Sequence, residues 1–260
     1  MTPRLPAVVT AAGDGTRFRP FTQYIPKEML PIGSQPALGH VITECLAAGA
    51  DHVYVVTRPG DQIVPIYVAD LHGQGLPVSA IAEDRSLGYG NAAPILTLTD
   101  HLAQADMFLV AFGDDVLLEQ APGTALAALC DLAHDADGSL AVQLIDHDQI
   151  RSFGAVEVTT PGGNRIARIW QRPDPSTVAE PLALVSRLVL RPPILKRLTA
   201  RPGANGEVDL GLAVGDLARD GDVRVHRMAG QWVSVGDPPC YADALRRWHE
   251  HTTTRGDAAC

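Results

Sequence analysis

Short apolar runs and stretches of helical periodicity alternate along the first 146 residues. Each run is short enough for one buried strand, whereas the segments between runs repeat their apolar residues every three or four positions, as one face of a helix does. The predicted strands span residues 5–9, 52–57, 76–81, 107–112 and 139–145, and the predicted helices span about 36–48, 61–72 and 122–133. Strands that alternate with helices predict a Rossmann-like α/β fold with a doubly wound, mostly parallel sheet.

The pattern changes after residue 146, where alternating strands and further helices replace the regular repeat. The predicted elements are a hairpin of residues 153–158 and 166–170, a strand at 182–190, a helix after Pro192 and a helix at about 210–218. This mixture predicts an α+β lobe that closes over the strand ends. Because neither a repeat nor a low-complexity linker separates the two halves, we predict one domain over residues 1–260, ending in a flexible polar tail at 251–260.

The composition narrows the classes of partner. The net charge of −9 argues against nucleic acid, because no domain-wide basic surface is available to neutralise its phosphates. Apolar residues make up 46% of the chain, which suffices for a core, yet no apolar run is long enough to span a membrane. The N-terminus shows no signal-peptide core and the four cysteines are scattered, so we expect a reduced, cytoplasmic protein.

The turn after the first predicted strand is built from small residues and leads to two cations. The residues concerned are Ala11, Ala12, Gly13, Gly15 and Thr16, followed by Arg17 and then Lys27. Small residues let backbone N–H groups approach an anion closely, and ligands of open α/β sheets bind at such strand ends. Basic side chains add fixed positive charge for phosphate oxygens. The segment therefore predicts a polyphosphate-binding loop.

Two better-known phosphate loops do not fit this segment. A Rossmann fingerprint needs a third glycine, and a Walker loop needs four residues between its glycines and a following Lys-Ser/Thr pair. Both features are missing here. An NAD-dependent dehydrogenase is therefore disfavoured. Asp114 and Asp115 supply the complementary chemistry, because they follow the predicted strand at 107–112 after a single glycine, at a position where carboxylates can hold Mg²⁺ against a nucleotide.

The opening segment, VVTAAGDGTRFRPFTQYIPKEMLPIG, resembles the signature of sugar-1-phosphate nucleotidyltransferases. Its IPKEMLP wording is most similar to that of bacterial UTP–glucose-1-phosphate uridylyltransferases. The resemblance implies the nucleotide-diphospho-sugar transferase fold, with residues 1–146 binding the nucleotide and 147–250 the sugar phosphate. It also implies Mg²⁺-dependent joining of a sugar 1-phosphate to a nucleoside triphosphate, with pyrophosphate released. Arg17, Lys27 and Asp114 take catalytic roles in this scheme, and Asp114 is the metal ligand.

Weaker similarity continues along the chain. Gly154 lies in a segment that resembles the family's sugar-pocket strand, and Glu207 matches a glutamate that accepts sugar hydroxyls. Residues 231–238 resemble the family's W-x-D-x-G-x-P motif, but Ser234 stands where that motif has its second metal-binding aspartate. Asp115 or Asp237 could compensate, or the metal could rely on Asp114 and the phosphates.

The phosphate and base contacts also depart from the family pattern. Gln171 and Arg172 replace a Glu-Lys pair, so the charge that contacts the sugar phosphate is kept while a carboxylate is lost. Glu83 lies five residues before Gly88, where uridylyl and thymidylyl members carry a glutamine. A carboxylate only accepts hydrogen bonds, which suits the two adjacent donors of guanine. We therefore expect GTP to be preferred, followed by UTP or dTTP, unless Glu83 points to solvent.

Alternative functions remain open on the same residues. The acceptor could be a non-sugar phosphate, a cyclitol phosphate or a phosphonate, which would fit Gln171 and Ser234. A non-catalytic module that binds a nucleotide or nucleotide sugar would also fit Ser234, although such a module would not need Arg17. From the resemblance we further expect a homo-oligomer, either a dimer or a tetramer.

Overall fold

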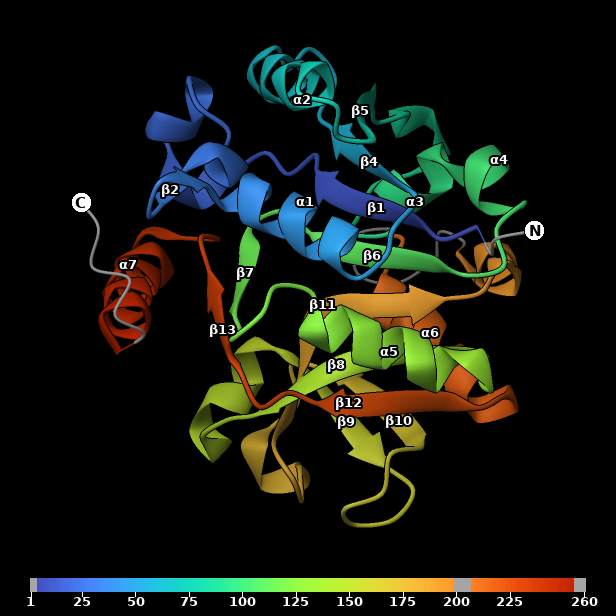
Figure 1. Ribbon diagram of the computed structural model, residues 1–260. Helices are drawn as coiled ribbons and strands as arrows, with labels where there is room; N and C mark the ends of the chain where they lie inside the picture. The colour runs from blue at the N-terminus through green and yellow to red at the C-terminus, as the bar shows by residue number, and fades with distance from the viewer. Residues whose placement is uncertain (1–3, 199–206, 255–260) are drawn as a thin grey trace.

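The structure is a computed structural model that describes residues 4–198 and 207–254. β1 (Pro6–Ala11) is an interior strand of its central sheet, and β4 (His52–Thr57) and β6 (Phe108–Phe112) lie parallel to it on either side (Figure 1). β5 (Val78–Ala82) lies parallel to β4. These strands are nearly continuous apolar runs because helices cover both faces of the sheet. β1 extends beyond its predicted end, so Ala11 closes the strand and the turn begins after it.

The regular alternation is interrupted by β11 (Leu182–Leu190), a strand from the second half of the chain. It lies between β6 and β8 (Gly138–Leu144) and runs antiparallel to both. The strand predicted at 139–145 is present, but β11 separates it from β6, its predecessor in the parallel sheet. Because β11 is buried on both faces and pairs along both edges, the second half of the chain shares the central sheet with the first.

The remaining strands of the sheet form the lower lobe in Figure 1. β9 (Gly154–Val158) and β10 (Ile166–Gln171) form the predicted antiparallel hairpin, in which Gly154 pairs with Gln171. β9 joins the sheet beside β11. β12 (Val223–Arg227) extends the sheet on its other side, parallel to β8.

Helices pack in two layers, one on each face of the sheet. Successive residues of a strand point to opposite faces, so Val9 and Leu109 pack with one layer while Val8 and Val110 pack with the other. The first layer contains α1 (Ala37–Ala47), α2 (Ile63–Gly73) and α5 (Thr124–His134), and the second contains α3 (Ala93–Thr97), α4 (Thr99–Leu102) and α6 (Leu210–Asp220). The second core contains residues from both halves of the chain, including Phe108 and Leu188.

A small appendage closes one end of the sheet. β7 (Asp115–Leu118) pairs antiparallel with β13 (Gln231–Ser234), β2 (Pro31–Ile32) pairs with β3 (Gln35–Pro36), and α7 (Pro238–Thr254) packs beside them. These strands are too short for periodicity to reveal. The helix continues to Thr254, so the expected flexible tail cannot begin at 251, while residues 255–260 lie outside the described part.

Short segments of 3-10 helix, of one or two turns each, fill several of the connections. They span Thr16–Phe18, Phe21–Gln23, Lys27–Met29, Arg85–Leu87, His147–Ser152, Pro175–Thr177 and Pro192–Arg197. The helix predicted after Pro192 is one of these. It begins at Pro192 and ends at Arg197, so a short 3-10 helix stands where the sequence predicted a helix.

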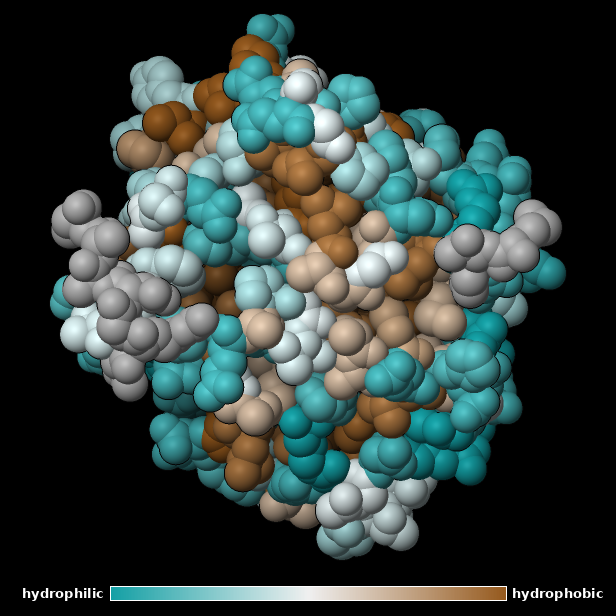
Figure 2. All heavy atoms as spheres, in the orientation of Figure 1, coloured by the Kyte–Doolittle hydropathy of each residue, from teal (hydrophilic) through white to brown (hydrophobic). Residues whose placement is uncertain are grey.

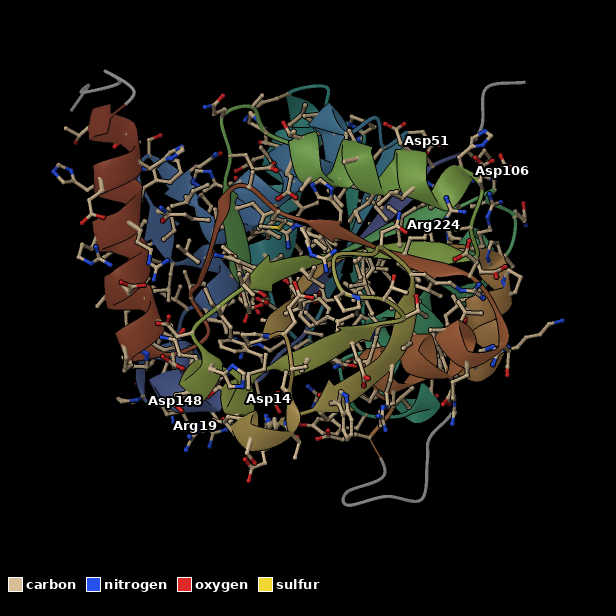
Figure 3. The ribbon with its side chains drawn as sticks, turned by 90° about the horizontal axis from the view of Figure 1, so that it is seen from below. Asp14, Arg19, Asp51, Asp106, Asp148 and Arg224 are labelled. Atoms are coloured by element: carbon tan, nitrogen blue, oxygen red, sulfur yellow. The ribbon has the colours of Figure 1, made fainter. Side chains whose placement is uncertain are left out.

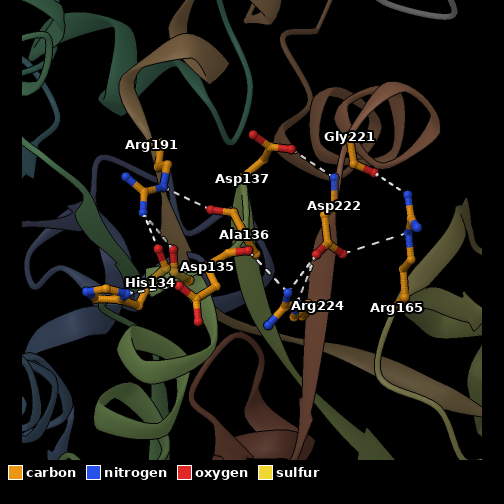
Figure 4. A network of polar contacts seen from close by, with 10 residues as sticks. His134, Asp135, Ala136, Asp137, Arg165, Arg191, Gly221, Asp222 and Arg224 are labelled. Carbon is orange, nitrogen blue, oxygen red and sulfur yellow. Dashed lines mark hydrogen bonds and ion pairs between the residues drawn. The ribbon is translucent and has the colours of Figure 1, made fainter.

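A polar network ties the two halves together at the end of the sheet where β6 begins (Figure 4). Arg191, directly after β11, donates to the backbone oxygens of Ala133, His134 and Ala136 and so satisfies the C-terminal end of α5. Arg224 of β12 donates to the Asp135 carbonyl oxygen at 3.1 Å. This end is therefore occupied by structural contacts.

In the view of Figure 2 polar atoms dominate the rim, whereas apolar atoms lie over α2, over the turns before β2 and across the middle of the face. The exposed apolar side chains of these segments are Phe21, Tyr24, Ile25, Ile63 and Ile66. Within residues 4–198 and 207–254, no helix is long and apolar enough to cross a membrane. The homo-oligomer expected from the resemblance stays a prediction.

Candidate active site

The carboxyl ends of β1 and β6 meet at the edge of the sheet opposite the Arg191 network. Gly113 follows β6, and its N–H donates to the Thr10 carbonyl oxygen at 2.9 Å. A Cβ at Gly113 would lie 2.9 Å from the same oxygen, so only glycine allows this approach. Asp14, beyond β1, lies at the opposite end of the molecule from Asp51 and Asp106, which precede β4 and β6 (Figure 3). Asp114 is thus placed beside the small-residue turn.

The conformation of the turn is fixed by Gly15 and Thr22. Gly15 has φ +61°, a conformation that favours glycine, and a Cβ there would lie 2.8 Å from the Thr22 methyl carbon. The Thr22 hydroxyl donates to the Gly15 carbonyl oxygen at 2.7 Å. Thr16 and Arg17 follow in a single 3-10 turn that leaves the Arg17 side chain exposed. The sequence-predicted turn therefore exists as a fixed loop.

Lys27 lies beneath this turn and contacts Asp114. Its Nζ is bound to Oδ2 of Asp114 and lies 3.8 Å from Oε1 of Glu28. Burial lowers the pKa of Lys27, but the negative charges of Asp114 and Glu28 outweigh burial and raise it, so the ammonium stays charged. A Cβ on Gly13 would lie 3.3 Å from Cε of Lys27, which shows that the turn covers the lysine closely.

Glu28 is a buried acid that motif reasoning did not single out as a site residue. Its side chain is 2% exposed, and its Oε2 has no hydrogen-bond partner among the described residues. Burial raises the pKa of Glu28 to about 7, against the opposing charge of Lys27. Glu28 is therefore the second acid beside the Lys27 ammonium, in addition to Asp114.

Asp115 and Ser234 form a hydrogen-bonded pair below Asp114. The Ser186 hydroxyl donates to Oδ2 of Asp115, and Ser234 adds a second side-chain hydrogen bond. Burial, together with the charge of Asp114, raises the pKa of Asp115. The Ser234 hydroxyl oxygen also accepts from the Gly236 N–H at 3.1 Å. Both groups are thus engaged with the protein, which disfavours Asp115 as the replacement metal ligand.

Arg17 pairs with Asp237 across the entrance of the site. The Nη1···Oδ2 distance is 3.1 Å, and Oδ1 of Asp237 accepts from the Cys240 N–H at the start of α7. These backbone and arginine contacts lower the pKa of Asp237. A Cβ on Gly236 would lie 3.4 Å from Nη2 of Arg17 and 3.6 Å from Oδ2 of Asp114. Gly236 therefore leaves room between the two charged groups.

The donor set can be compared with what Mg²⁺ requires. Among residues 4–198 and 207–254, no group of three or more His, Cys, Asp or Glu side chains could hold a metal ion. Asp114 is bound by Lys27, while Asp237 is paired with Arg17. Mg²⁺ commonly binds one or two carboxylates together with substrate phosphates and waters. The residues therefore fit a metal held largely by a triphosphate.

Glu83, the predicted base selector, does not point to solvent. Its side chain is 9% exposed, and Oε2 lies 3.3 Å from Nε of Arg85. Arg85 in turn pairs with Asp14 at 3.0 Å, which ties the second turn to the first. Burial raises the pKa of Glu83, while Arg85 opposes this effect. The carboxylate already binds a guanidinium, so it is less available to two donors of a base.

The predicted sugar-side residues come from two neighbouring segments. Gly154 and Gln171 are opposite each other in the hairpin, and Nε2 of Gln171 donates to Oδ1 of Asp209 at 3.1 Å. Arg172 follows with φ 46° and an exposed side chain. Glu207 is exposed, in a bridge with Tyr89.

The turn around Gly88 packs against this second segment. Gly88 has φ +132°, and the neighbouring Gly90 could not carry a Cβ, which would lie 2.5 Å from the Val208 carbonyl oxygen. The Val208 N–H donates to the Tyr89 carbonyl oxygen at 2.7 Å. Base and sugar segments are thus adjacent. Asn205 and Gly206, which belong to the same motif as Glu207, lie outside the described residues.

Sequence reasoning missed the buried ion pair that supports Asp115. Arg187 of β11 is fully buried and binds Glu44 of α1 through Nε···Oε1 at 2.7 Å and Nη2···Oε2 at 2.8 Å. Its Nη2 also donates to the Asp115 carbonyl oxygen at 2.8 Å. The available signal was an arginine in the middle of a predicted buried strand, because a fully buried charge needs a partner.

Comparison with known proteins places these features in a family. The family model described as Nucleotidyl transferase matches residues 6–251, almost the entire chain. The chain belongs to the nucleotidyl transferase family. The resemblance and the enzyme class predicted from the opening segment are thereby confirmed.

Two curated relatives of this nucleotidyltransferase and one solved structure of similar fold agree with that assignment. UTP–glucose-1-phosphate uridylyltransferase YngB of Bacillus subtilis (strain 168) is 25% identical, over 89% of this chain and 84% of the relative. A UTP–glucose-1-phosphate uridylyltransferase of Streptococcus pyogenes is 27% identical, over 91% and 86%. The crystal structure of an apo UDP-glucose pyrophosphorylase has a TM-score of 0.83 at 22% identity, over 95% of this chain and 98% of that one. This structural match confirms the predicted fold.

Proposed function

We propose that this nucleotidyltransferase joins a hexose 1-phosphate to UTP and releases pyrophosphate. The observation that carries the proposal is the convergence of the Gly13–Gly15 turn, Lys27, Asp114 and Arg17 at one edge of the sheet. Phosphate-binding groups and a carboxylate are the parts that such a transfer needs, since positioning and charge neutralisation account for most of its catalysis. The names of the curated relatives support UTP and glucose 1-phosphate as the pair to test first.

The reaction needs no nucleophile from the protein. An oxygen of the sugar 1-phosphate forms a bond to the α-phosphorus, the bond between that phosphorus and the bridging oxygen breaks, and pyrophosphate leaves with the electron pair. Backbone N–H groups of the turn bind the triphosphate, and Arg17 neutralises the departing pyrophosphate. Lys27 neutralises the α-phosphate, and Arg172 orients the incoming phosphate. Glu207 accepts hydrogen bonds from the sugar hydroxyls.

Asp114 is the residue that would hold Mg²⁺, with Asp237 as a second candidate once Arg17 turns to phosphate. When bound, the metal supplies positive charge against the phosphate oxygens. Ser234 does not replace the missing carboxylate, because its hydroxyl already binds Asp115 and the Gly236 N–H.

The guanine preference expected from Glu83 is not supported by the curated relatives compared above, which are named for UTP. The Glu83–Arg85 pair is a further reason to place UTP first, since a carboxylate that holds a guanidinium has fewer lone pairs for guanine donors. The variant Glu83→Gln restores the glutamine of uridylyl members. If Glu83 selects guanine, this variant will lower the GTP/UTP ratio of kcat/KM by about tenfold or more, whereas an unchanged ratio will show that Glu83 serves only Arg85.

The deciding experiment is pyrophosphate release with UTP, GTP, dTTP, CTP and ATP, each offered against several hexose 1-phosphates in the presence of Mg²⁺. A clear preference for UTP with a hexose 1-phosphate is the expected result. Gln171, held by Asp209, favours inclusion of cyclitol phosphates and a phosphonate in the acceptor panel. Turnover with these acceptors alone would refute the sugar assignment. Tight nucleotide binding without any turnover would refute catalysis and favour a binding module.

A further inference from the structure

The carboxylate proposed for the metal is already bound by a cation of the protein. Nζ of Lys27 contacts Oδ2 of Asp114, and the two side chains are only 14% and 15% exposed. An ammonium and a divalent cation that share one oxygen repel each other strongly at such short range, more so in a partly buried site. Asp115 offers no alternative, since Ser186 and Ser234 bind its carboxylate. Lys27 and a metal therefore compete for Asp114.

Glu28 offers the Lys27 ammonium a second carboxylate when it leaves Asp114. Glu28 is a second acid beside the ammonium, with Oε1 3.8 Å from Nζ and with its buried Oε2 lacking a hydrogen-bond partner among the described residues. The absence of a side chain at Gly13 leaves the lysine stem directly under the turn, 3.3 Å from where a Cβ would be. A phosphate on the turn would thus meet an ammonium that keeps Glu28 as its counter-ion.

We propose that Lys27 is an internal counter-ion that closes Asp114 to divalent cations until a triphosphate draws the ammonium away. The movement of Lys27 to the phosphate rests on the function proposed above, whereas the competition for Asp114 does not. A direct consequence is that metal and triphosphate bind together. The triphosphate draws the Lys27 ammonium away from Asp114, and the metal occupies the carboxylate that otherwise holds the ammonium. The Arg17–Asp237 pair at 3.1 Å repeats the arrangement at the entrance, with a phosphate-binding cation held by a carboxylate.

Mn²⁺ binding to the full chain without nucleotide tests the proposal directly. Free Mn²⁺ would be measured by electron paramagnetic resonance during titration of the wild type and of Lys27→Met. Lys196→Met is the matched control, because Lys196 is the other lysine of the sequence and is exposed. An opposite charge at contact changes the proton affinity of a carboxylate by a factor of about 10 to 1,000, so the Lys27→Met variant should bind Mn²⁺ at least about tenfold more tightly. Lys196→Met should match the wild type.

Two further variants keep the titration decisive. Lys27→Met/Asp114→Asn should lose the gain, because the freed carboxylate is gone. Lys27→Met/Glu28→Gln also removes the second buried acid. It replaces the Lys27→Met variant in the titration if Lys27→Met melts at a much lower temperature than the wild type. Equal Mn²⁺ affinity of the wild type and the Lys27→Met variants, or a gain that survives Asp114→Asn, would overturn the proposal. The titration contains no nucleotide or sugar, so a silent substrate panel beside a positive titration would refute the proposed function and leave the competition for Asp114 intact.

Discussion

The Glu44–Arg187 pair gives the sharpest test of how the fold supports the site. Replacing Arg187 by Met removes the guanidinium and leaves the Glu44 carboxylate buried without its partner. It also removes donors to the backbone oxygens of Asp115 and Ser186, at 2.8 and 3.0 Å. Arg187 is fully buried, so solvent cannot compensate.

The expected magnitude follows from those contacts. Breaking a buried pair by removing one partner costs about 3–5 kcal/mol, because an uncompensated charge remains. Glu44→Leu/Arg187→Met removes that charge and leaves mainly the two unpaired carbonyl oxygens, which cost about 1–3 kcal/mol each at most. The double variant should therefore be more stable than the single Arg187→Met variant, although it lacks one more native side chain.

The assay is urea-induced unfolding followed by tryptophan fluorescence. Arg151→Met is the control, since Arg151 is an exposed arginine whose loss should change stability by no more than about 0.5 kcal/mol. An Arg187→Met variant within about 1 kcal/mol of the wild type would refute the reasoning, as would a double variant less stable than Arg187→Met. Because Arg187 holds the Asp115 peptide, the folded double variant should also bind Mn²⁺ in the presence of UTP more weakly than the wild type.

Three further predictions concern single positions. The pKa of Glu28 is about 7 in the folded protein against an ordinary 4.5, so between these values the folded state binds more protons than the unfolded state. The stability of the wild type relative to Glu28→Gln should therefore fall by up to about 3 kcal/mol as the pH rises from 4.5 to 8. Parallel stability curves of the two proteins in unfolding titrations would contradict this. Gly113→Ala should lower the free energy of unfolding by about 1–3 kcal/mol because its Cβ would lie 2.9 Å from the Thr10 carbonyl oxygen, whereas Gly73→Ala, with open space, should not destabilise; equal effects in urea unfolding would show that the close approach is unimportant. Arg17→Ala should lower kcat/KM for the triphosphate by about 10- to 100-fold, as expected for a lost charge-assisted hydrogen bond, and an unchanged value in the pyrophosphate-release assay would exclude the proposed contact.

Much of the fold could be predicted from local patterns. The parallel strands and their helices are visible because burial on both faces leaves continuous apolar runs, and the hairpin at 153–170 is visible because its residues alternate. The place of β11 could not be predicted, since an apolar run does not show which strands it will pair with. β7 and β13 were missed because pairs of such length carry no periodicity of their own.

The site shows the same division between local motif and distant contact. The turn at Gly13 and Gly15, with Arg17 next to it, is a property of neighbouring residues, and the sequence by itself determined it together with the family. Only the tertiary structure decided which charges meet. Lys27 reaches Asp114 over 87 positions, Arg85 reaches Asp14 over 71, and Arg187 reaches Glu44 over 143. A turn forms through contacts between near neighbours, whereas these ion pairs depend on strand order and burial, which no local pattern encodes.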